Sequence, residues 1–315
     1  MEQTDVDDIK TVVISAVIVL NITLNVLVIA VIVRHPQLRE DRTTLFMLSL
    51  TLSDLANGCT AMPISAALCS NATPYVRTMT RFLPSIQEFW SVWFNLVSMH
   101  SLCWVTVCKM VAITKPLRYE QILTRKRCYL IICSTWVAGA IFASTLISGS
   151  TVWNLNTCMY HLDIEGSTFV ASALFFGVTV GILMPVVVIV YATTRIFFVI
   201  VRTHLEITTQ VNSIGGEAGA VGTTPNVTLK SIRSGRNVLL ICLAYVILTI
   251  PITVSIIASV LGKSNNLPAL YTFICVWILM CNSSANSLIY VILFRSVRTK
   301  TAVMISMCFS KMKCW

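Results

Sequence analysis

The sequence has little charge. Only 11% of its 315 residues are charged, whereas about 25% are charged in an average soluble domain. It also contains no glycine-rich nucleotide loop, no cysteine and histidine cluster at metal-ligand spacing and no catalytic-triad spacing. We therefore expect neither a soluble domain nor an enzyme. The absence of an internal repeat counts against transporter folds that are built from duplicated halves.

What the chain does contain is a series of seven long apolar stretches. Each is long enough to form a helix of about 20 residues, the length that crosses a hydrocarbon core about 30 Å thick. The stretches cover residues 11–33, 43–68, 82–107, 128–148, 169–194, 238–261 and 267–293. Together with a hydrophobic content of 56%, they predict an all-α membrane protein, a seven-transmembrane helix bundle that forms a single domain over 1–315.

Positive charge is concentrated on one side of these stretches. If the N-terminus lies outside, 19 of the 23 Lys and Arg residues fall in the inner loops and the tail. Short loops rich in Lys and Arg remain cytoplasmic. The sequence therefore predicts a multi-pass protein of the plasma membrane with its N-terminus outside. The net charge of +10 is then explained by contact with anionic membrane lipid rather than with nucleic acid.

The longest connection and the tail both lie on the predicted inner side. Residues 208–228 are rich in Gly, Ser, Thr and Ala, which predicts a flexible third inner loop. Residues 294–315 are expected to form a cytoplasmic tail with a short amphipathic helix on the membrane surface. In this tail Cys308 and Cys314 are flanked by basic residues, which makes both of them candidates for palmitoylation.

A carboxylate lies near the middle of the second apolar stretch. A charged side chain at the depth of Asp54 costs about 2.5–3.5 kcal/mol on insertion scales and therefore needs polar partners. Candidate partners recur at helical spacing in three other stretches: Asn21 and Asn25; Gln87, Ser91, Asn95 and Ser98; and Asn282, Asn286 and Tyr290, with Ser283 and Ser287 beside them. One carboxylate among neutral oxygen donors suits Na⁺ or a proton. The alternative is a hydrogen-bond network that only holds the helices together.

The order of several residues resembles the rhodopsin-like G-protein-coupled receptors over nearly the whole chain. The resemblance rests on Asn25, Asp54 in LSLTLSDL, the stretch VAITKPLRY, Trp136, Pro185, Pro251 and Tyr290 at the end of NSSANSLIY. It implies a bundle that binds a small ligand outside and activates a heterotrimeric G protein inside. It also implies a sodium pocket, with no other cofactor, at Asp54, Ser98, Asn282, Ser283 and Asn286, next to Asn25.

The residues that switch such receptors are altered in this chain. The switch positions implied by the resemblance are Cys108, Lys109, Met110, Pro251 and Tyr290. The first three stand where the family usually has Asp-Arg-Tyr, so the carboxylate beside the cation is missing and Lys replaces the planar fork of Arg. Ser287 replaces the usual proline after Asn286. Three interpretations stay open: unusual coupling, high basal activity, or lost coupling.

Only two cysteines, Cys69 and Cys158, fall in the predicted outer loops. There the compartment is oxidising, so they either pair with each other or remain two unpaired thiols. Receptors of the resembled family usually join the start of helix three to the second outer loop, but Pro84 stands at that helix-three position here. The resemblance therefore implies a relocated disulfide between Cys69 and Cys158.

A ligand pocket is expected in the outer half of the bundle. Its candidate residues are Gln87, Glu88, Ser91, Asn95 and Trp277. Amine receptors of the resembled family carry an Asp at the position of Ser91, so an amine ligand here would depend on Glu88, one turn outward, for its ion pair. Two other functions stay open. One is a non-signalling partner that forms a homomer or heteromer with a receptor, and the other is an ion-coupled transporter that uses Asp54.

Overall fold

The computed structural model describes residues 3–69, 83–146, 151–154, 158–162, 172, 176–177, 179–213, 240, 243–251, 254, 269–293 and 295–312. In chain order the helices are α1 (Gln3–Arg34), α2 (Pro36–Arg39), α3 (Arg42–Cys59), α4 (Ala61–Cys69), α6 (Leu83–Thr114), η1 (Pro116–Arg118), α7 (Tyr119–Ile122), α8 (Arg125–Leu146), η2 (Thr179–Leu183), α10 (Met184–Ser213), α12 (Ala269–Leu293) and α13 (Arg295–Met312). A two-stranded antiparallel hairpin, β1 (Thr151–Asn154) with β2 (Met159–Leu162), precedes η2.

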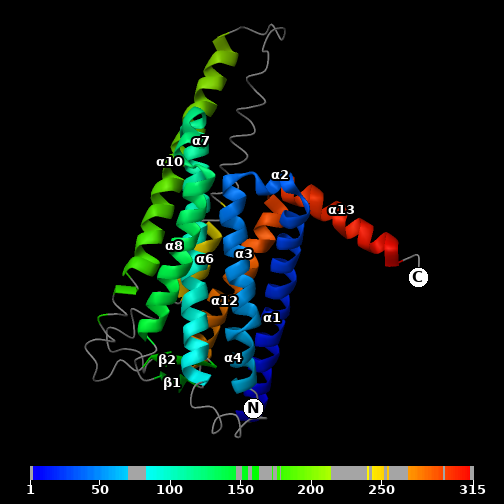
Figure 1. Ribbon diagram of the computed structural model, residues 1–315, viewed down its shortest axis with the longest axis vertical. Coiled ribbons are helices and arrows are strands. Elements are labelled where there is room, and N and C mark those ends of the chain that lie inside the picture. The colour runs from blue at the N-terminus through cyan, green and yellow to red at the C-terminus, as the bar shows by residue number, and fades with distance from the viewer. Residues whose placement is uncertain are drawn as a thin grey trace.

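The long helices lie side by side in an elongated bundle with two distinct ends (Figure 1). The N-terminus and the hairpin lie at one end, which we call the hairpin end. Helices α2 and α7 and the start of α13 lie at the other, which we call the α2 end. Five segments within the described ranges are long and apolar enough to cross a membrane: Asp8–Arg34, Ser85–Thr114, Arg125–Thr145, Thr179–Thr203 and Leu270–Ile292.

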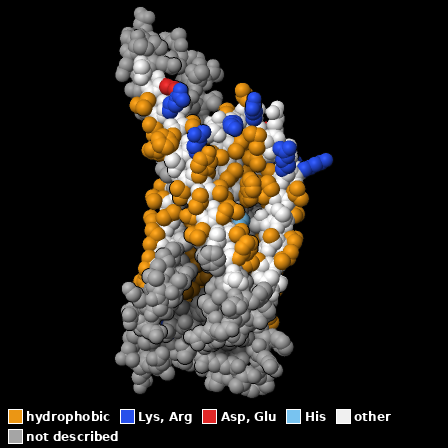
Figure 2. All heavy atoms as spheres, turned by 90° about the vertical axis from the view of Figure 1, so that its left-hand side faces the viewer, with side chains coloured by type: hydrophobic (Ala, Val, Ile, Leu, Met, Phe, Trp, Pro, Cys, Tyr) orange, Lys and Arg blue, Asp and Glu red, His pale blue; other side chains and the backbone are white. Residues whose placement is uncertain are grey.

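The surface of the bundle matches a membrane environment. Large apolar side chains point outward from the middle of the helices, and Leu130 on α8 and Val187 on α10 are 70% and 67% exposed. Figure 2 shows these hydrophobic side chains over the middle of one face, with Lys and Arg gathered toward the α2 end. An apolar belt with charge at its rim is the pattern that a lipid bilayer stabilises. The chain is therefore a membrane protein.

The second predicted span is not one continuous helix. It divides at Thr60 into α3 and α4, and the Thr60 backbone leaves the helical region with φ −121° and ψ −78°. The cause lies in the sequence, because Pro63 has no N–H to donate to the carbonyl of Cys59 four residues earlier. The Thr60 hydroxyl donates to the Ala56 carbonyl at 2.7 Å and satisfies one group near the break. The span expected over 43–68 is thus formed by two helices that meet three residues before Pro63.

Other boundaries also differ from those expected. Helix α6 continues to Thr114, so Cys108, Lys109 and Met110 are helical rather than part of a loop boundary. Helix α10 continues to Ser213, which makes the start of the expected flexible segment 208–228 helical. The rest of that segment lies outside the described residues, as does most of the predicted span 238–261. The C-terminal ends of α6 and α10 continue as helix beyond the apolar run. A prediction from hydropathy alone places the end of a helix where the apolar run ends.

The hairpin was not expected, because its strands are only four residues each. Thr151 pairs with Leu162 and Trp153 with Tyr160 in the antiparallel register. Directly before β2, Cys158 has φ 55°, a left-handed conformation that a turn requires and that non-glycine residues seldom adopt. Its sulfur forms a disulfide with Cys69 at the end of α4, and the two Cα atoms lie 5.3 Å apart. This is the disulfide that the resemblance implied, and it ties the hairpin to the bundle.

Tryptophan hydrogen bonds connect three of the helices. The indole Nε1 of Trp136 on α8 donates to Ser49 Oγ on α3 at 3.0 Å. Trp93 Nε1 on α6 donates in turn to the Trp136 carbonyl at 2.9 Å. The hydroxyls of Ser49 and Ser101 lie 3.0 Å apart and extend the link back to α6. Because no water competes for these groups in the membrane, such bonds help to fix how the helices pack.

Gly58 permits the close approach of α1 to α3 beside Asp54, and we predict that Gly58→Val destabilises the protein. A Cβ atom at this position would lie 2.7 Å from Asn21 Nδ2, which is held by the Asp54 carbonyl at 3.0 Å. The two helices would have to separate, at a cost of about 1–3 kcal/mol. Thermal unfolding of purified protein measures the effect. Cys59→Val, at the exposed neighbouring position, is the matched control and should leave the melting temperature unchanged.

Candidate functional site

The carboxylate of Asp54 lies in the interior of the bundle. The residue is 1% exposed, on the face of α3 that packs against α6 and α12. Ser283 Oγ on α12 donates to Asp54 Oδ1 at 2.9 Å. The side chains of Ser98 on α6 and Asn286 on α12 also lie beside the carboxylate. The structure therefore brings four of the predicted pocket residues together from three helices.

Several polar atoms around this carboxylate have no hydrogen-bond partner within the described part of the chain. The buried atoms are Asp54 Oδ2, Asn57 Oδ1 and Asn286 Nδ2. A buried polar atom without a partner costs free energy, and a buried charge costs more. Carboxylate, amide and hydroxyl oxygens are the ligands that a hard cation prefers. The donor set therefore fits a small cation such as Na⁺, or a proton on the carboxylate.

The predicted partners do not all contribute equally. Asn282 is half-buried, and no hydrogen bond within the described ranges joins it to the Asp54 carboxylate. Asn57, one turn along α3 from Asp54, was missed, although it stands in the same stretch of sequence. Its Nδ2 reaches the sulfur of Met280 on α12 at 3.9 Å, and its Oδ1 has no hydrogen-bond partner among the described residues. An Asp followed three residues later by Asn on one helix face was the signal that could have identified it.

A second set of hydrogen bonds fixes α1 against the same centre. Asn21 Nδ2 donates to the Asp54 carbonyl, and Asn25 Nδ2 donates to the Asn21 carbonyl at 2.9 Å and to its Oδ1. Ser287 Oγ on α12 donates to Asn25 Oδ1 at 2.6 Å. Proline, the usual residue at position 287 in the resembled family, carries no hydroxyl for this contact. Asn25 therefore joins α1 to α12 and belongs to the network around the carboxylate rather than to its immediate contacts.

The five candidate pocket residues lie toward the hairpin end on α6 and α12. Gln87 is fully buried and its Nε2 faces Ser65 Oγ on α4 at 3.5 Å, while Glu88 is half-buried. Asn95 Nδ2 donates to the Ser91 carbonyl at 2.8 Å along α6. Trp277 on α12 is 3% exposed and belongs to a separate apolar cluster with Ile14 and Met62. The structure places four of the five on α6 and one, Trp277, on α12.

A cation is buried near that tryptophan. Lys10 on α1 is 6% exposed, and its Nζ lies 5.9 Å from the centre of the Phe273 ring. Phe273 packs on Trp277 with the ring centres 6.1 Å apart. The interior at the hairpin end therefore contains a carboxylate on α6 and an ammonium group on α1. Lys10 was not among the residues predicted for the pocket.

The predicted switch residues are buried or half-buried, and Lys109 lies at the α2 end. Cys108 and Tyr290 are both 0% exposed, Met110 and Pro251 are half-buried, and Lys109 points to the start of α3. There the Lys109 Nζ lies 4.0 Å from Asp41 Oδ2. Cys108 and Tyr290 belong to one buried apolar cluster, and Met110 packs against it. Lys109 instead meets a carboxylate that sequence reasoning missed.

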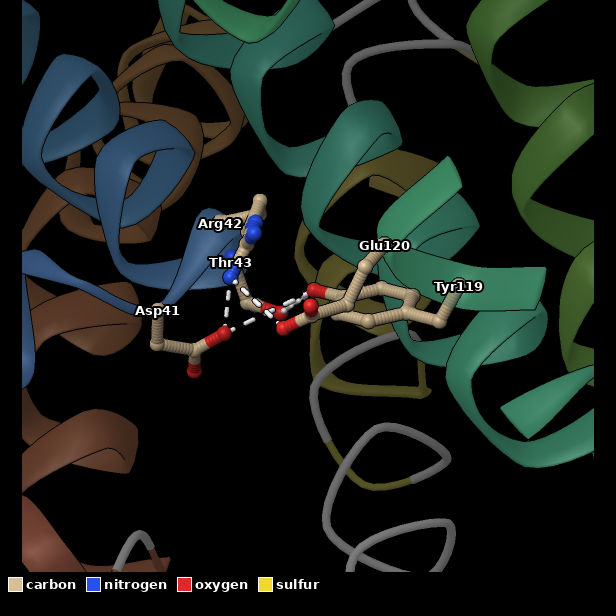
Figure 3. A network of polar contacts seen from close by, with 5 residues as sticks. All are labelled: Asp41, Arg42, Thr43, Tyr119 and Glu120. Atoms are coloured by element: carbon tan, nitrogen blue, oxygen red, sulfur yellow. Dashed lines mark hydrogen bonds and ion pairs between the residues drawn. The ribbon is translucent and has the colours of Figure 1, made fainter. Parts of the chain in front are cut away.

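Polar contacts at this end join the first connection, between α1 and α3, to the second connection, between α6 and α8 (Figure 3). The Tyr119 hydroxyl lies 3.5 Å from Asp41 Oδ1 and 3.4 Å from Thr43 Oγ1. Arg42 Nη1 donates to Glu120 Oε1 at 3.1 Å. Burial raises the pKa of the Tyr119 hydroxyl, so it stays protonated and can donate at physiological pH. Nothing in the sequence pairs residues about 78 positions apart, so these contacts come from the fold alone.

The two candidate lipidation sites are only partly placed. Cys308 is part of helix α13, while Cys314 lies outside the described residues. Helix α13 packs on α1 and α12 through the buried side chains of Val297, Thr301 and Met304. Its opposite face carries Arg298 and Val303, which are exposed. One face of α13 is thus held by the bundle, and the other is available to lipid.

Comparison with known proteins gives consistent results across most of the chain. The sequence family described as 7 transmembrane receptor (rhodopsin family) matches residues 24–290. The octopamine receptor beta-1R of Drosophila melanogaster is 23% identical over 92% of this chain, which spans 60% of that receptor's length. The trace amine-associated receptor 8b of Rattus norvegicus is 23% identical over 90% of this chain and 81% of its own length. The probable G-protein coupled receptor 21 of Homo sapiens is 27% identical over 86% of this chain and 76% of its own.

Proposed function

Because the chain belongs to the rhodopsin family of seven-transmembrane receptors, we propose that it is a plasma-membrane receptor that binds a small extracellular ligand and activates a heterotrimeric G protein. The observation that carries this proposal is the family match over residues 24–290, which includes the Asp54 centre and Tyr290. Members of this family are receptors rather than enzymes, and the relatives named above are receptors as well.

We propose that the hairpin end faces outward and the α2 end faces the cytoplasm. Exposed basic side chains support this orientation, since Arg39, Lys115 and the run Arg125–Arg127 all lie at the α2 end. Lys and Arg at this rim would contact anionic lipid at about 1 kcal/mol for each residue near the surface. The disulfide supports the same orientation, because it then lies in the oxidising compartment.

The ligand site is proposed between α6 and α12 at the hairpin end. Two of the relatives are named an octopamine receptor and a trace amine-associated receptor. A cationic amine needs a carboxylate in a water-poor site. Glu88 supplies that carboxylate here in place of an Asp at Ser91. Gln87, Ser91 and Asn95 on α6 and Trp277 on α12 would complete the site with polar and aromatic contacts.

We also propose that Asp54 binds Na⁺ in the inactive receptor. The support is chemical, because the buried Asp54 Oδ2 and Asn57 Oδ1 have no hydrogen-bond partner within the described ranges. Asp54 Oδ1, bonded to Ser283, and Ser98 on α6 would complete an oxygen-rich site. A bound cation would hold α3, α6 and α12 together, and its loss would let them rearrange.

The coupling proposal is tested by ligand-free G-protein activation across G-protein subtypes. The contact between Lys109 Nζ and Asp41 Oδ2 is 4.0 Å, which is long for an ion pair, so we expect measurable basal activity in the wild type. Cys108→Asp/Lys109→Arg restores an adjacent carboxylate and a bidentate donor, and should lower that activity several-fold at matched surface expression. Silence in both proteins, with capture of another receptor at the cell surface, would instead support the non-signalling heteromer.

A further inference from the structure

We infer that Asp41 at the start of α3 is the positioning residue for Lys109, and that it supplies the restraint that Cys108 lacks the charge to provide. The inference rests on the proposed function, since it assigns the residue that sets basal coupling. Lys109 Nζ and Asp41 Oδ2 lie 4.0 Å apart, and their side chains are 16% and 46% exposed. The contact connects the inner end of α6 with the connection between α2 and α3.

The position of Asp41 is set by its role at the helix terminus. Asp41 is the N-cap of α3, and its Oδ1 accepts a hydrogen bond from the Thr43 backbone N–H at 3.2 Å. An acidic N-cap is stabilised by the partial positive charge at the start of a helix. Because Oδ1 is held in this way, Oδ2 is directed to Lys109. The two oxygens of one carboxylate thus have different partners.

Contacts from the second connection hold the same carboxylate. Tyr119 reaches Asp41 Oδ1 and Thr43 Oγ1, and Arg42 forms an ion pair with Glu120 at 3.1 Å. Figure 3 shows these side chains from the two connections meeting in one place. An isolated ion pair with this much exposure contributes little, but a set of contacts on two segments acts together. Displacement of α6 or of the second connection would break several of these contacts at once.

Cys108, the residue before Lys109, does not compete with Asp41 for the Lys109 ammonium group. Cys108 is fully buried and has no carboxylate oxygen to offer to Lys109. A carboxylate at that position would be covalently next to the cation and would move with α6. Asp41, in contrast, belongs to another segment, so its contact with Lys109 is lost when α6 moves. This makes the pair a restraint between segments rather than a local one.

A double-mutant cycle on the melting temperature of the purified protein tests the pair without any G protein. The variants are Asp41→Asn, Lys109→Gln and the double variant. Asparagine is as good an N-cap as aspartate, so Asp41→Asn removes the charge and keeps the cap. We expect each single variant to lower the melting temperature by about 1–3 °C, and the double variant to lower it no further. If the double variant lowers the melting temperature by the sum of the two single effects, the two residues do not form the proposed pair.

Ligand-free signalling tests the restraint itself. At matched surface expression Asp41→Asn should raise basal G-protein activation about threefold, and the charge exchange Asp41→Lys/Lys109→Asp should return it toward the wild-type level. Glu40→Gln, which removes an exposed carboxylate next to Asp41, is the matched control and should change nothing. Unchanged basal activity in Asp41→Asn overturns the inference where the wild type signals. Where the wild type is silent the coupling proposal fails, and the melting-temperature cycle alone decides the pair.

Discussion

Cys158→Ser is expected to remove most of the protein from the cell surface and to lower the melting temperature of what remains. The disulfide to Cys69 closes a segment with a sequence separation of 89 residues. For a loop of that length in a free chain, the entropic model gives about 4 kcal/mol of stabilisation, and membrane insertion of the intervening helices reduces it. The turn at Cys158 also needs the bond, because a non-glycine residue at φ 55° is unfavourable without it.

Surface labelling together with thermal unfolding measures the result. Cys69→Ser and the double variant should match Cys158→Ser, because any of the three changes removes the same bond. Cys133→Ser is the control, since Cys133 is an exposed free cysteine on α8. Full surface expression of Cys158→Ser would mean that the hairpin is held by its other contacts with α6 and that the disulfide is dispensable.

Asp54→Asn is expected to abolish the response of the protein to sodium. In the wild type, NaCl at tenfold excess over the dissociation constant adds about 1.4 kcal/mol to the stability of the folded state. For a chain of this size that corresponds to about 2–4 °C in melting temperature. In Na⁺-free buffer Asp54→Asn should be more stable than the wild type. The variant no longer buries a charged oxygen that has no partner within the described residues.

The measurement compares NaCl with choline chloride at equal ionic strength, so that screening is constant. Ser53→Ala is the matched control, since the buried Ser53 hydroxyl donates only to the Leu50 carbonyl of its own helix. It should keep the sodium response of the wild type. An equal sodium shift in Asp54→Asn and wild type would place the cation elsewhere and leave the Asp54 centre as a hydrogen-bond network that holds the helices together.

Several features of the site could be predicted from the sequence, because they depend only on which residue lies at a given depth in the membrane. A carboxylate in the middle of an apolar stretch must find polar partners, so its place in the sequence is enough to identify Asp54. Helical spacing on another stretch is enough to identify Ser283 and Asn286 as candidate partners, and both lie beside the carboxylate. The break at Thr60 was also within reach of sequence reasoning. A proline inside an apolar stretch, here Pro63, predicts an interruption of the helix near this point.

Other features were missed because their partners come from distant parts of the chain. Asp41 looks like an ordinary helix cap in the sequence, and its contacts with Lys109 and Tyr119 exist only once the two connections meet. Ser287 was noted as a departure from a family pattern, and the structure shows its hydroxyl bonded to Asn25. The hairpin was missed because strands of four residues are too short for a periodic pattern to be recognised.

By itself, the sequence determined that this protein lies in a membrane, that its basic side chains gather at one end and that Asp54 is its central buried charge. Each of these depends on the cost of moving one kind of side chain out of water, which is a property of the residue and its depth. Only the tertiary structure decided which atoms meet: that Ser283 and Ser287 face different partners, and that Lys109 is held by Asp41 rather than by its neighbour. Hydrogen bonds and ion pairs act over a few ångströms, so they depend on helix packing that no local pattern encodes.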